Sequence, residues 1–236
     1  MCGRYNLGVQ SATQLALALQ AEIRPGDEAL YRPRYNVAPT DVTWIVRLEE
    51  ERRVLVPARW GFSSSTGRFL INARSETAAT RTAFREGWRS ARCLVPSTGF
   101  YEWKGPPKKR RPIWFHPPDG GLLLLAGLME RSPRRPGSGG DGPVHPQFVI
   151  LTTDANELVS EVHERMPAIL RPEQLGDWLA APPTQALEPA PSEWLVATPV
   201  SSRLNSVSND DPELLLPDPP EAEGKSGQLD LFGGSD

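Results

Sequence analysis

The sequence predicts an α+β fold, a single domain in which short helices flank a mainly antiparallel, barrel-like sheet. Strand-like segments are numerous and follow one another without the regular βαβ alternation that builds a parallel sheet. The chain has 236 residues, of which 39% are hydrophobic, so it can bury one sizeable core. Residues 1–209 hold 25 basic and 21 acidic residues, whereas residues 210–236 hold one basic and eight acidic residues. We therefore expect a folded, mildly basic body over 1–209 and a disordered acidic tail over 210–236.

The first part of the chain is expected to form a short strand, two helices and a pair of strands. Ser11 is a suitable N-cap for an amphipathic helix over Ser11–Ile23, in which apolar residues recur on one face. Val42–Leu48 and Val54–Phe62 flank a charged turn, which is typical of neighbouring antiparallel strands. Glu76–Trp88 predicts the second helix.

The second part is expected to be mostly strands. The predicted strands are Arg92–Pro96, Gly99–Lys104, Pro112–His116, Leu122–Met129, Gln147–Thr152 and Trp194–Val200. Two short helices are expected between them, over Ala155–Val162 and, opened by its proline, Pro172–Ala180. The segment Arg131–Pro146 is rich in Gly, Pro and Arg and predicts a loop between two strands.

Composition excludes several classes of protein. The sequence has no apolar run of about 18 residues and no basic segment followed by an apolar one at its start, so we expect neither a membrane span nor a secretory signal. Two cysteines fit a reducing compartment, and Cys93 lies in an apolar run typical of a core strand. Two cysteines and three scattered histidines predict no metal site or cofactor. We expect a cytoplasmic protein.

Cys2 directly follows the initiator Met1, and this position allows unusual chemistry. Removal of Met1 would leave an amine and a thiol on one residue, which can capture an aldehyde as an imine and then close to a thiazolidine. An α-amine titrates near pH ~7.7 to 8.0 and a thiol near ~8.5, so both have a reactive fraction at neutral pH. The alternative is that Cys2 is a buried, inert residue.

Three further segments place polar groups in apolar sequence. Asn72, Arg74 and Glu76 alternate as they would on one face of an extended stretch. Glu102 lies between aromatic residues in a predicted strand, and His163 follows a predicted helix. Structural alternatives stay open for each: a turn with a solvated Arg74–Glu76 pair, a surface carboxylate, and a histidine interacting with the helix dipole.

Together these segments belong to a set of six motifs that occur in a fixed order. The motifs are Met1–Tyr5, Tyr35–Thr40, Arg59–Phe62, Asn72–Thr77, Arg92–Pro96 with Gly99–Trp103, and Leu151–Asn156 with His163–Pro167. They resemble, over almost the whole body, the SOS response-associated peptidase family, whose proteins process abasic sites in DNA. We expect the fold and the activity of this family because of the resemblance, and not because of the composition or the spacing of residues.

The resemblance implies that Met1 is removed by autopeptidase-type processing and that Cys2 crosslinks to the ring-opened aldehyde of an abasic site in single-stranded DNA. This DNA damage response would protect the site during replication, with a lyase-like activity and no cofactor. Glu102, with a pKa raised by its aromatic neighbours, would carry protons during imine formation. His163 would protonate the sugar ring oxygen, and Asn72 would orient the amine or the sugar.

Contacts to DNA are also implied by the resemblance. The expected DNA-binding residues are Gly3, Arg4, Pro39, Arg74, Trp103, Thr152 and Arg165. Guanidinium groups match phosphate oxygens, and an indole can stack on a base. The basic run Lys108–Arg111 either tracks the DNA backbone or forms a solvated hairpin tip. The chain departs from the family's pattern at Ser63–Arg68, where no aromatic residue precedes Phe69.

The tail contains a short motif of a different kind. Gln228-Leu229-Asp230-Leu231-Phe232 resembles the peptide by which bacterial repair proteins dock into the sliding clamp, with Gln228, Leu231 and Phe232 as anchors. The alternative is a chance match in a polar tail. We expect a monomer that associates with the nucleoid when bound to DNA.

Two other functions fit the same residues. One is a thiol peptidase in which Cys2, Glu102 and His163 act on peptide bonds. The other is a binding module for single-stranded DNA with a structural Cys2. A denaturation-resistant adduct between the Met1-processed protein and an abasic oligonucleotide would distinguish the crosslinking enzyme from both.

Overall fold

The computed structural model describes residues 3–64, 66–106, 109–130, 145–183 and 187–218. Cys2 and the tail anchors Gln228, Leu231 and Phe232 therefore lie outside the described residues, as does most of the predicted loop Arg131–Pro146. None of the described helices is long and apolar enough to cross a membrane.

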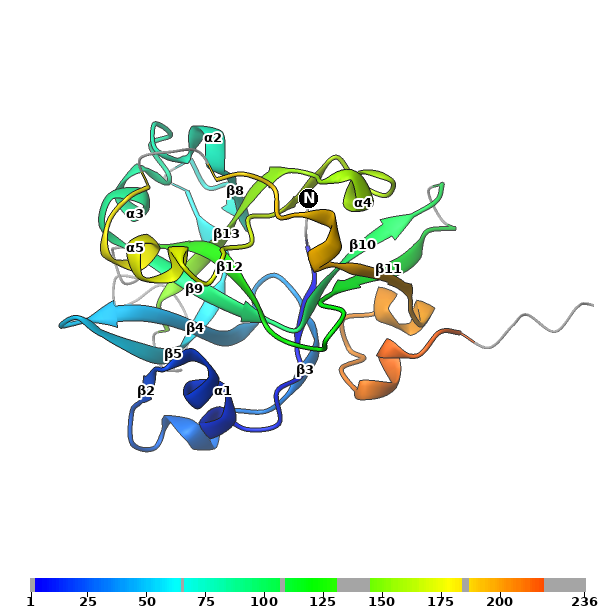
Figure 1. Cartoon of the computed structure of the whole chain (residues 1–236), viewed down its shortest axis with the longest axis horizontal. Helices are drawn as coiled ribbons and strands as arrows, with labels where there is room; N and C mark the ends of the chain where they lie inside the picture. The colour runs from blue at the N-terminus through cyan, green and yellow to red at the C-terminus, as the bar shows by residue number, and fades with distance from the viewer. Residues whose placement is uncertain (1–2, 65, 107–108, 131–144, 184–186, 219–236) are drawn as a thin grey trace, which may run out of the picture.

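A closed ring of strands forms the centre of the molecule (Figure 1). Its antiparallel path runs through β5 (Arg52–Trp60), β4 (Val42–Glu49), β9 (Arg92–Ser97), β12 (Leu123–Met129) and β13 (Gln147–Asp154). The start of β13 then pairs in parallel with the end of β5, which closes the ring. The predicted α+β fold with a mainly antiparallel, barrel-like sheet is confirmed.

A second, antiparallel sheet packs against this ring. Its strands, in spatial order, are β15 (Val196–Pro199), β11 (Arg111–His116), β10 (Gly99–Lys104), β1 (Tyr5–Leu7) and β3 (Arg34–Val37). Tyr5, Phe100 and Phe115 from this sheet share one buried cluster with Trp60 and Ile150 from the ring. Burial of this apolar surface joins the two sheets into one body.

Short strands extend the central sheet at its margins. They are β2 (Glu22–Ile23), β8 (Asn72–Arg74) and β14 (Arg165–Pro167), while β6 (Phe62–Ser63) and β7 (Phe69–Leu70) form a separate hairpin. The second half of β13 pairs with β14 in an antiparallel and with β8 in a parallel manner. Segments far apart in the chain therefore meet along β13.

Two helices differ from their predicted extents. Helix α1 (Ala12–Leu19) begins after the predicted N-cap Ser11 but ends earlier, because Gln20 adopts a left-handed conformation with φ 48°. The predicted helix Glu76–Trp88 is split into α2 (Ser75–Ala78) and α3 (Arg85–Ser90). Between them the Thr80 hydroxyl donates to the Thr77 carbonyl, a local bond that competes with helix continuation.

The remaining helical segments are short. They are α4 (Glu157–Ser160), α5 (Gln174–Ala180) and the 3₁₀ helices η1 (Asp27–Leu30), η2 (Ser192–Trp194), η3 (Ser202–Asn205) and η4 (Pro212–Leu215). Helices α4 and α5 lie within the predicted helical segments Ala155–Val162 and Pro172–Ala180.

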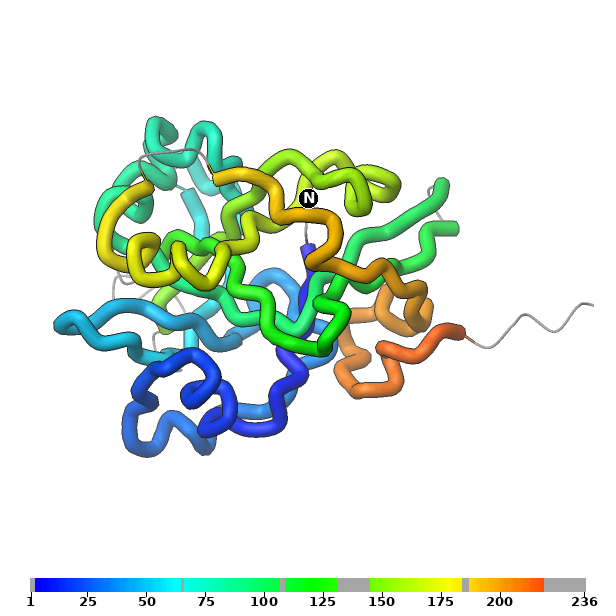
Figure 2. The backbone as a smooth tube through the Cα atoms, in the orientation of Figure 1, coloured from blue at the N-terminus to red at the C-terminus, as the bar shows by residue number. Residues whose placement is uncertain are grey.

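The predicted start of the tail at residue 210 needs correction, because the described structure continues to Asp218. Leu214 in η4 is fully buried, and the Asp210 carboxylate accepts hydrogen bonds from the backbone N–H groups of Tyr35 and Asn36. The same carboxylate pairs with Arg34. These contacts fix the segment against β3, beside the N-terminal strands (Figure 2).

Candidate functional site

A cleft of about 460 Å³ opens where the N-terminal end of the described chain meets β10 and the segment after α4. Its lining residues are Gly3, Arg4, Glu102, Trp103, Gly105, Arg110, Val162 and His163. The structure therefore brings together Glu102 and His163, which are 61 residues apart in the sequence. Gly3 directly follows Cys2 in the chain, so the cleft also receives the residue next to the predicted nucleophile.

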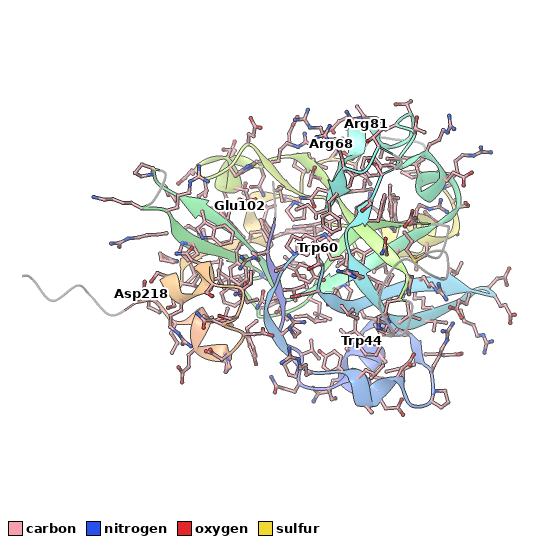
Figure 3. The ribbon with its side chains drawn as sticks, turned by 180° about the vertical axis from the view of Figure 1, so that it is seen from behind. Trp44, Trp60, Arg68, Arg81, Glu102 and Asp218 are labelled. Atoms are coloured by element: carbon pink, nitrogen blue, oxygen red, sulfur yellow. The ribbon has the colours of Figure 1, made fainter. Side chains whose placement is uncertain are left out.

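Glu102 is a buried carboxyl group on β10, only 5% exposed. Side chains alternate along a strand, so Glu102 shares its face with Phe100, while Tyr101 and Trp103 lie on the other face. Burial raises the pKa of Glu102 to about 7, although the charge of Arg110 acts in the opposite direction. Near neutral pH this carboxyl group, labelled in Figure 3, can therefore either accept or donate a proton.

His163 is held by two contacts in the turn that follows α4. Its backbone N–H donates to the Val159 carbonyl (2.9 Å), and its Nδ1 accepts the backbone N–H of Arg165 (3.0 Å). Burial lowers the pKa of His163 below its ordinary value. Because Nδ1 is the acceptor, the neutral ring carries its proton on Nε2. At neutral pH this histidine is thus a hydrogen-bond donor rather than a charged acid.

Arg4 and Trp103 form one wall of the cleft. The Arg4 guanidinium donates from Nη1 to the Asn36 side chain (2.8 Å) and to the Leu204 carbonyl (3.0 Å). It also lies over the Trp103 ring, 5.9 Å from the ring centre. The Trp103 indole donates to the side chain of Asn205 (2.7 Å). Both residues are therefore oriented by the segment around η3.

Asn36 is the buried link between this wall and the C-terminal segment. Its Oδ1 accepts from Arg4, and its Nδ2 donates to the carbonyl groups of Ser206 (3.0 Å) and Asn209 (2.9 Å). Asp210 holds the Asn36 backbone from the other side. Asn36 was expected only as part of the motif Tyr35–Thr40, because its carbonyl partners Ser206 and Asn209 lie about 170 positions further along the chain.

The other predicted site residues lie along β8, β13 and β14. Asn72 is half-buried and stands opposite Ile150 in the parallel β8–β13 pair, but it is not among the described residues that line the cleft. Arg74 is exposed at the end of β8, opposite the buried Thr152. The extended stretch predicted from Asn72 to Glu76 therefore ends at Arg74, and Glu76 belongs to α2.

Arg165, which was predicted to bind DNA, already has several partners within the described protein. Its side chain is 8% exposed and pairs with Glu76 and Asp154. It also donates from Nη2 to the Thr152 carbonyl (2.7 Å). With these partners the Arg165 guanidinium ties α2, β13 and β14 together, and its backbone N–H holds the His163 ring. Its observed contacts fit a positioning role.

Pro39 lies in a tight turn after β3 and is half-buried. The turn is closed by the Asp41 N–H, which donates to the Ala38 carbonyl (3.1 Å), and Thr40 adopts a left-handed φ of 80°. The Asp41 carboxylate also pairs with Arg34. Because Arg34 pairs with Asp210 as well, one arginine holds both this turn and the C-terminal segment.

Three lining residues, Gly105, Arg110 and Val162, had no specific predicted role. Arg110 was predicted only as one member of a basic run, and Val162 only as part of a helix. All four residues of the run are basic, so the sequence does not reveal which one faces the cleft. Within the described ranges no group of three His, Cys, Asp or Glu side chains is placed to hold a metal ion.

The strand ring, the antiparallel second sheet and the cleft beside the N-terminal strand define a known class. The family model described as SOS response associated peptidase (SRAP) matches residues 1–207, and the chain belongs to this family. The resemblance carried by the six sequence motifs is thereby confirmed.

Individual relatives match nearly the whole chain. The chain is 34% identical to the abasic site processing protein YoqW of Bacillus subtilis over 91% of this chain and 99% of that protein. It is 32% identical to the abasic site processing protein YedK of Escherichia coli, over 92% and 100% of the two chains. The abasic site processing protein HMCES of Gallus gallus is 31% identical over 92% of this chain and 78% of its own length.

Solved structures share the fold. A crystal structure of a Bacteroides thetaiotaomicron protein superposes with a TM-score of 0.76 at 24% identity, covering 92% of this chain and 99% of its own. A crystal structure of a Bordetella bronchiseptica protein gives 0.66 at 26% identity, over 85% of this chain and 100% of its own.

Proposed function

We propose that this chain processes abasic sites in single-stranded DNA by forming a covalent bond between Cys2 and the ring-opened sugar aldehyde. The relatives that match over nearly their whole length are named abasic site processing proteins, which supports the substrate class. The observation that carries the proposal is the cleft in which Glu102, His163 and Arg4 meet the residue that follows Cys2.

The proposed reaction has two steps and releases one water molecule. After Met1 is removed, the Cys2 amine attacks the aldehyde carbon, and loss of the former carbonyl oxygen as water gives an imine. The thiolate sulfur then adds to the imine carbon while the nitrogen takes up a proton, which closes a thiazolidine ring. The carbon–sulfur bond makes the product more stable than an imine alone.

Glu102 and His163 would supply the proton transfers of the first step. With a pKa raised to about 7, Glu102 exists in both protonation states at neutral pH and can accept the proton of the attacking amine and return it to the departing oxygen. His163 would donate a hydrogen bond from Nε2 to the sugar and favour the open aldehyde. The lowered pKa of His163 makes it a donor in its neutral form.

The DNA strand would be held by the walls of the same cleft. Arg4 and Arg110 place positive charge there, and Trp103 offers an aromatic surface for stacking. We assign Arg74 and Pro39 to contacts at the margin, with Gly3 leaving room for the strand. Arg165 and Thr152 would support these contacts from beneath. Asn72 on β8 would orient the Cys2 amine or the sugar.

The decisive experiment compares two cysteine variants. The full chain, with Met1 removal verified by mass spectrometry, is incubated with a single-stranded oligonucleotide that carries one abasic site, and heat-stable adducts are resolved on a denaturing gel. We expect Cys2→Ser to lose the heat-stable adduct but to retain some imine that borohydride can trap, because the amine remains.

Cys93→Ala is the matched control, since Cys93 is fully buried in β9 and burial raises the pKa of its thiol. This variant should form the adduct at the wild-type level. A heat-stable adduct from Cys2→Ser at wild-type yield would refute the thiazolidine scheme. Absence of any adduct from the processed wild-type protein would favour the peptidase or the binding module.

A further inference from the structure

A row of arginines follows the outer side of α3. The Arg85 backbone N–H donates to the Arg81 carbonyl (2.8 Å), which places these residues one helical turn apart. Arg89 follows Arg85 by another turn within α3, so these two side chains lie on the same face of the helix, and Arg81 precedes them in the turn that leads into α3. Phe84 and Trp88 occupy a different side of the segment and are buried. We call Arg81, Arg85 and Arg89 the α3 arginine row.

The α3 arginine row is not neutralised by the rest of the described protein. All three arginines are exposed, and their side chains form no hydrogen bond or ion pair with any residue in the described ranges. Glu86 is the only acidic residue of α3. Arg85 and Arg89 are like charges spaced four residues apart in α3, an arrangement that destabilises a helix, and no contact inside the described protein offsets this cost.

The surrounding segment is also strongly basic. Residues 63–92 contain six arginines, two glutamates and neither lysine nor aspartate, although the whole chain has a net charge of −3. One of the two glutamates, Glu76, is already paired with the buried Arg165. The free positive charge of the segment therefore faces solvent and suits an anionic polymer.

This basic surface extends from the candidate site toward α3. Arg74 is exposed at the end of β8, and in Figure 1 β8 and α2 stand between the N-terminal end and α3. Figure 3 shows Arg68 and Arg81 at one corner of the molecule, apart from Glu102. Arg68 precedes Phe69, an aromatic residue that is 46% exposed. The surface thus combines guanidinium groups with an accessible ring.

We propose that the α3 arginine row binds the phosphate backbone of the DNA strand where it continues beyond the cleft, and so anchors the strand outside the reacting nucleotide. This inference rests on the proposed function, since it takes DNA as the ligand. Successive turns of a helix separate the charges by about 6 Å, which is comparable to the separation of neighbouring phosphates in an extended strand. The contacts involve phosphate only and are independent of base sequence.

The test measures how strongly salt weakens binding to undamaged single-stranded DNA of about 30 nucleotides, which is longer than the site of a typical small binding domain. The variant Arg81→Gln/Arg85→Gln/Arg89→Gln keeps good helix formers at each position. Each phosphate contact to a single strand contributes about 0.7 to the slope of log affinity against log salt, so three lost contacts should reduce the slope by about 2. Adduct yield at saturating abasic DNA should stay at the wild-type level.

The control variant also removes three positive charges, but from arginines that form ion pairs within the protein. Arg24, Arg52 and Arg203 form ion pairs with Glu49, Glu22 and Asp211, respectively. Substitution of these three by Gln should leave the salt slope near that of the wild type. A wild-type slope in the row variant, or an equal loss in the control, would overturn the inference.

The two proposals can fail separately. If the wild-type protein forms no adduct with abasic DNA, the proposed function fails, whatever the salt slope. If the adduct forms but the row variant binds undamaged DNA with an unchanged slope, the α3 arginine row is not a DNA contact and the proposed function stands.

Discussion

Burial brings the pKa of Glu102 into the neutral range. The Glu102 side chain is a carboxyl group placed on the apolar face of β10, next to Phe100, and burial holds its pKa near 7. Its position in the cleft with His163 gives the site one group that exchanges protons near neutral pH and one that donates a hydrogen bond without charge.

The raised pKa of Glu102 predicts a pH-dependent stability difference for Glu102→Gln. The folded protein keeps the proton up to about pH 7, whereas the unfolded chain releases it near pH 4.5, so ionising the buried carboxyl group destabilises the folded state as pH rises between these values. We expect the variant to be more stable than the wild type at pH 8 by about 1 to 3 kcal/mol. The difference should vanish near pH 4, and urea unfolding at both pH values measures it.

An equal stability difference at pH 4 and pH 8 would show that the substitution acts through packing and not through ionisation. The same variant should slow imine trapping by borohydride. A variant that is more stable and less reactive would identify Glu102 as a group kept for chemistry at the expense of stability.

At the scale of the elements, β10 begins at a glycine that no larger residue can replace without displacing its neighbours. A Cβ atom at Gly99 would lie 2.1 Å from Nε1 of Trp114 and 2.7 Å from the carbonyl oxygen of Phe115. The Trp114 indole donates to the Asn6 side chain, which joins β11 to β1. Gly99 therefore permits the close packing of β10, which carries Glu102, against its neighbours β1 and β11.

Gly99→Ala is expected to lower the free energy of unfolding by about 1 to 3 kcal/mol, because the methyl group must displace the indole or the backbone. Gly176→Ala is the control, since nothing lies within 4 Å of a Cβ at that position in α5. Alanine favours helix over glycine, so the control should keep or raise stability. Urea unfolding compares the two, and equal midpoints would contradict the packing argument.

Local patterns predicted the elements well, but long-range contacts could not be derived from them. The strand Gly99–Lys104 was predicted with its observed ends, because turn residues bound it on both sides. The closing pair between β13 and β5 and the salt bridge between Arg165 and Glu76 depend on contacts across about 90 residues, which no local period encodes. Helix α1 ends early for a local reason, because Gln20 adopts a left-handed conformation. Glutamine rarely adopts this conformation, so the sequence did not predict the end of the helix.

The candidate site shows the same contrast between local patterns, which could be predicted, and long-range contacts, which could not. Glu102 and His163 were predicted from their segments and lie in one cleft, whereas the prediction of Arg165 as a DNA-binding residue did not anticipate its carboxylate partners Glu76 and Asp154. Arginines in a sequence do not disclose which ones are paired in space. Asn36 was likewise hidden, because its partners are backbone carbonyl groups, which carry no sequence signature.

At the scale of the whole molecule, the clamp motif in 228–232 stays a prediction from sequence. We expect deletion of Gln228–Phe232 to abolish co-purification with a bacterial sliding clamp, because the motif supplies the apolar anchors. Adduct formation with free abasic oligonucleotides should be unchanged, since the described body ends at Asp218 and contains the cleft.

The alanine substitution of Leu229 is the matched control, since Leu229 is not one of the predicted anchors. It should retain clamp binding, whereas Phe232→Ala should lose it. Clamp binding that survives the deletion would show that the motif is a chance match.

The link from Asp210 through Asn36 to Arg4 also orders events in time. A ribosome makes the segment that contains Cys2 first, and residues 204–210, which complete the hydrogen bonds around Arg4 and Asn36, are made roughly 10 to 40 seconds later at ordinary elongation rates. The cleft wall is therefore among the last parts of the protein to be completed. A nascent chain would expose its N-terminus to cellular aldehydes before the wall exists, and only the finished molecule would combine that N-terminus with a built cleft.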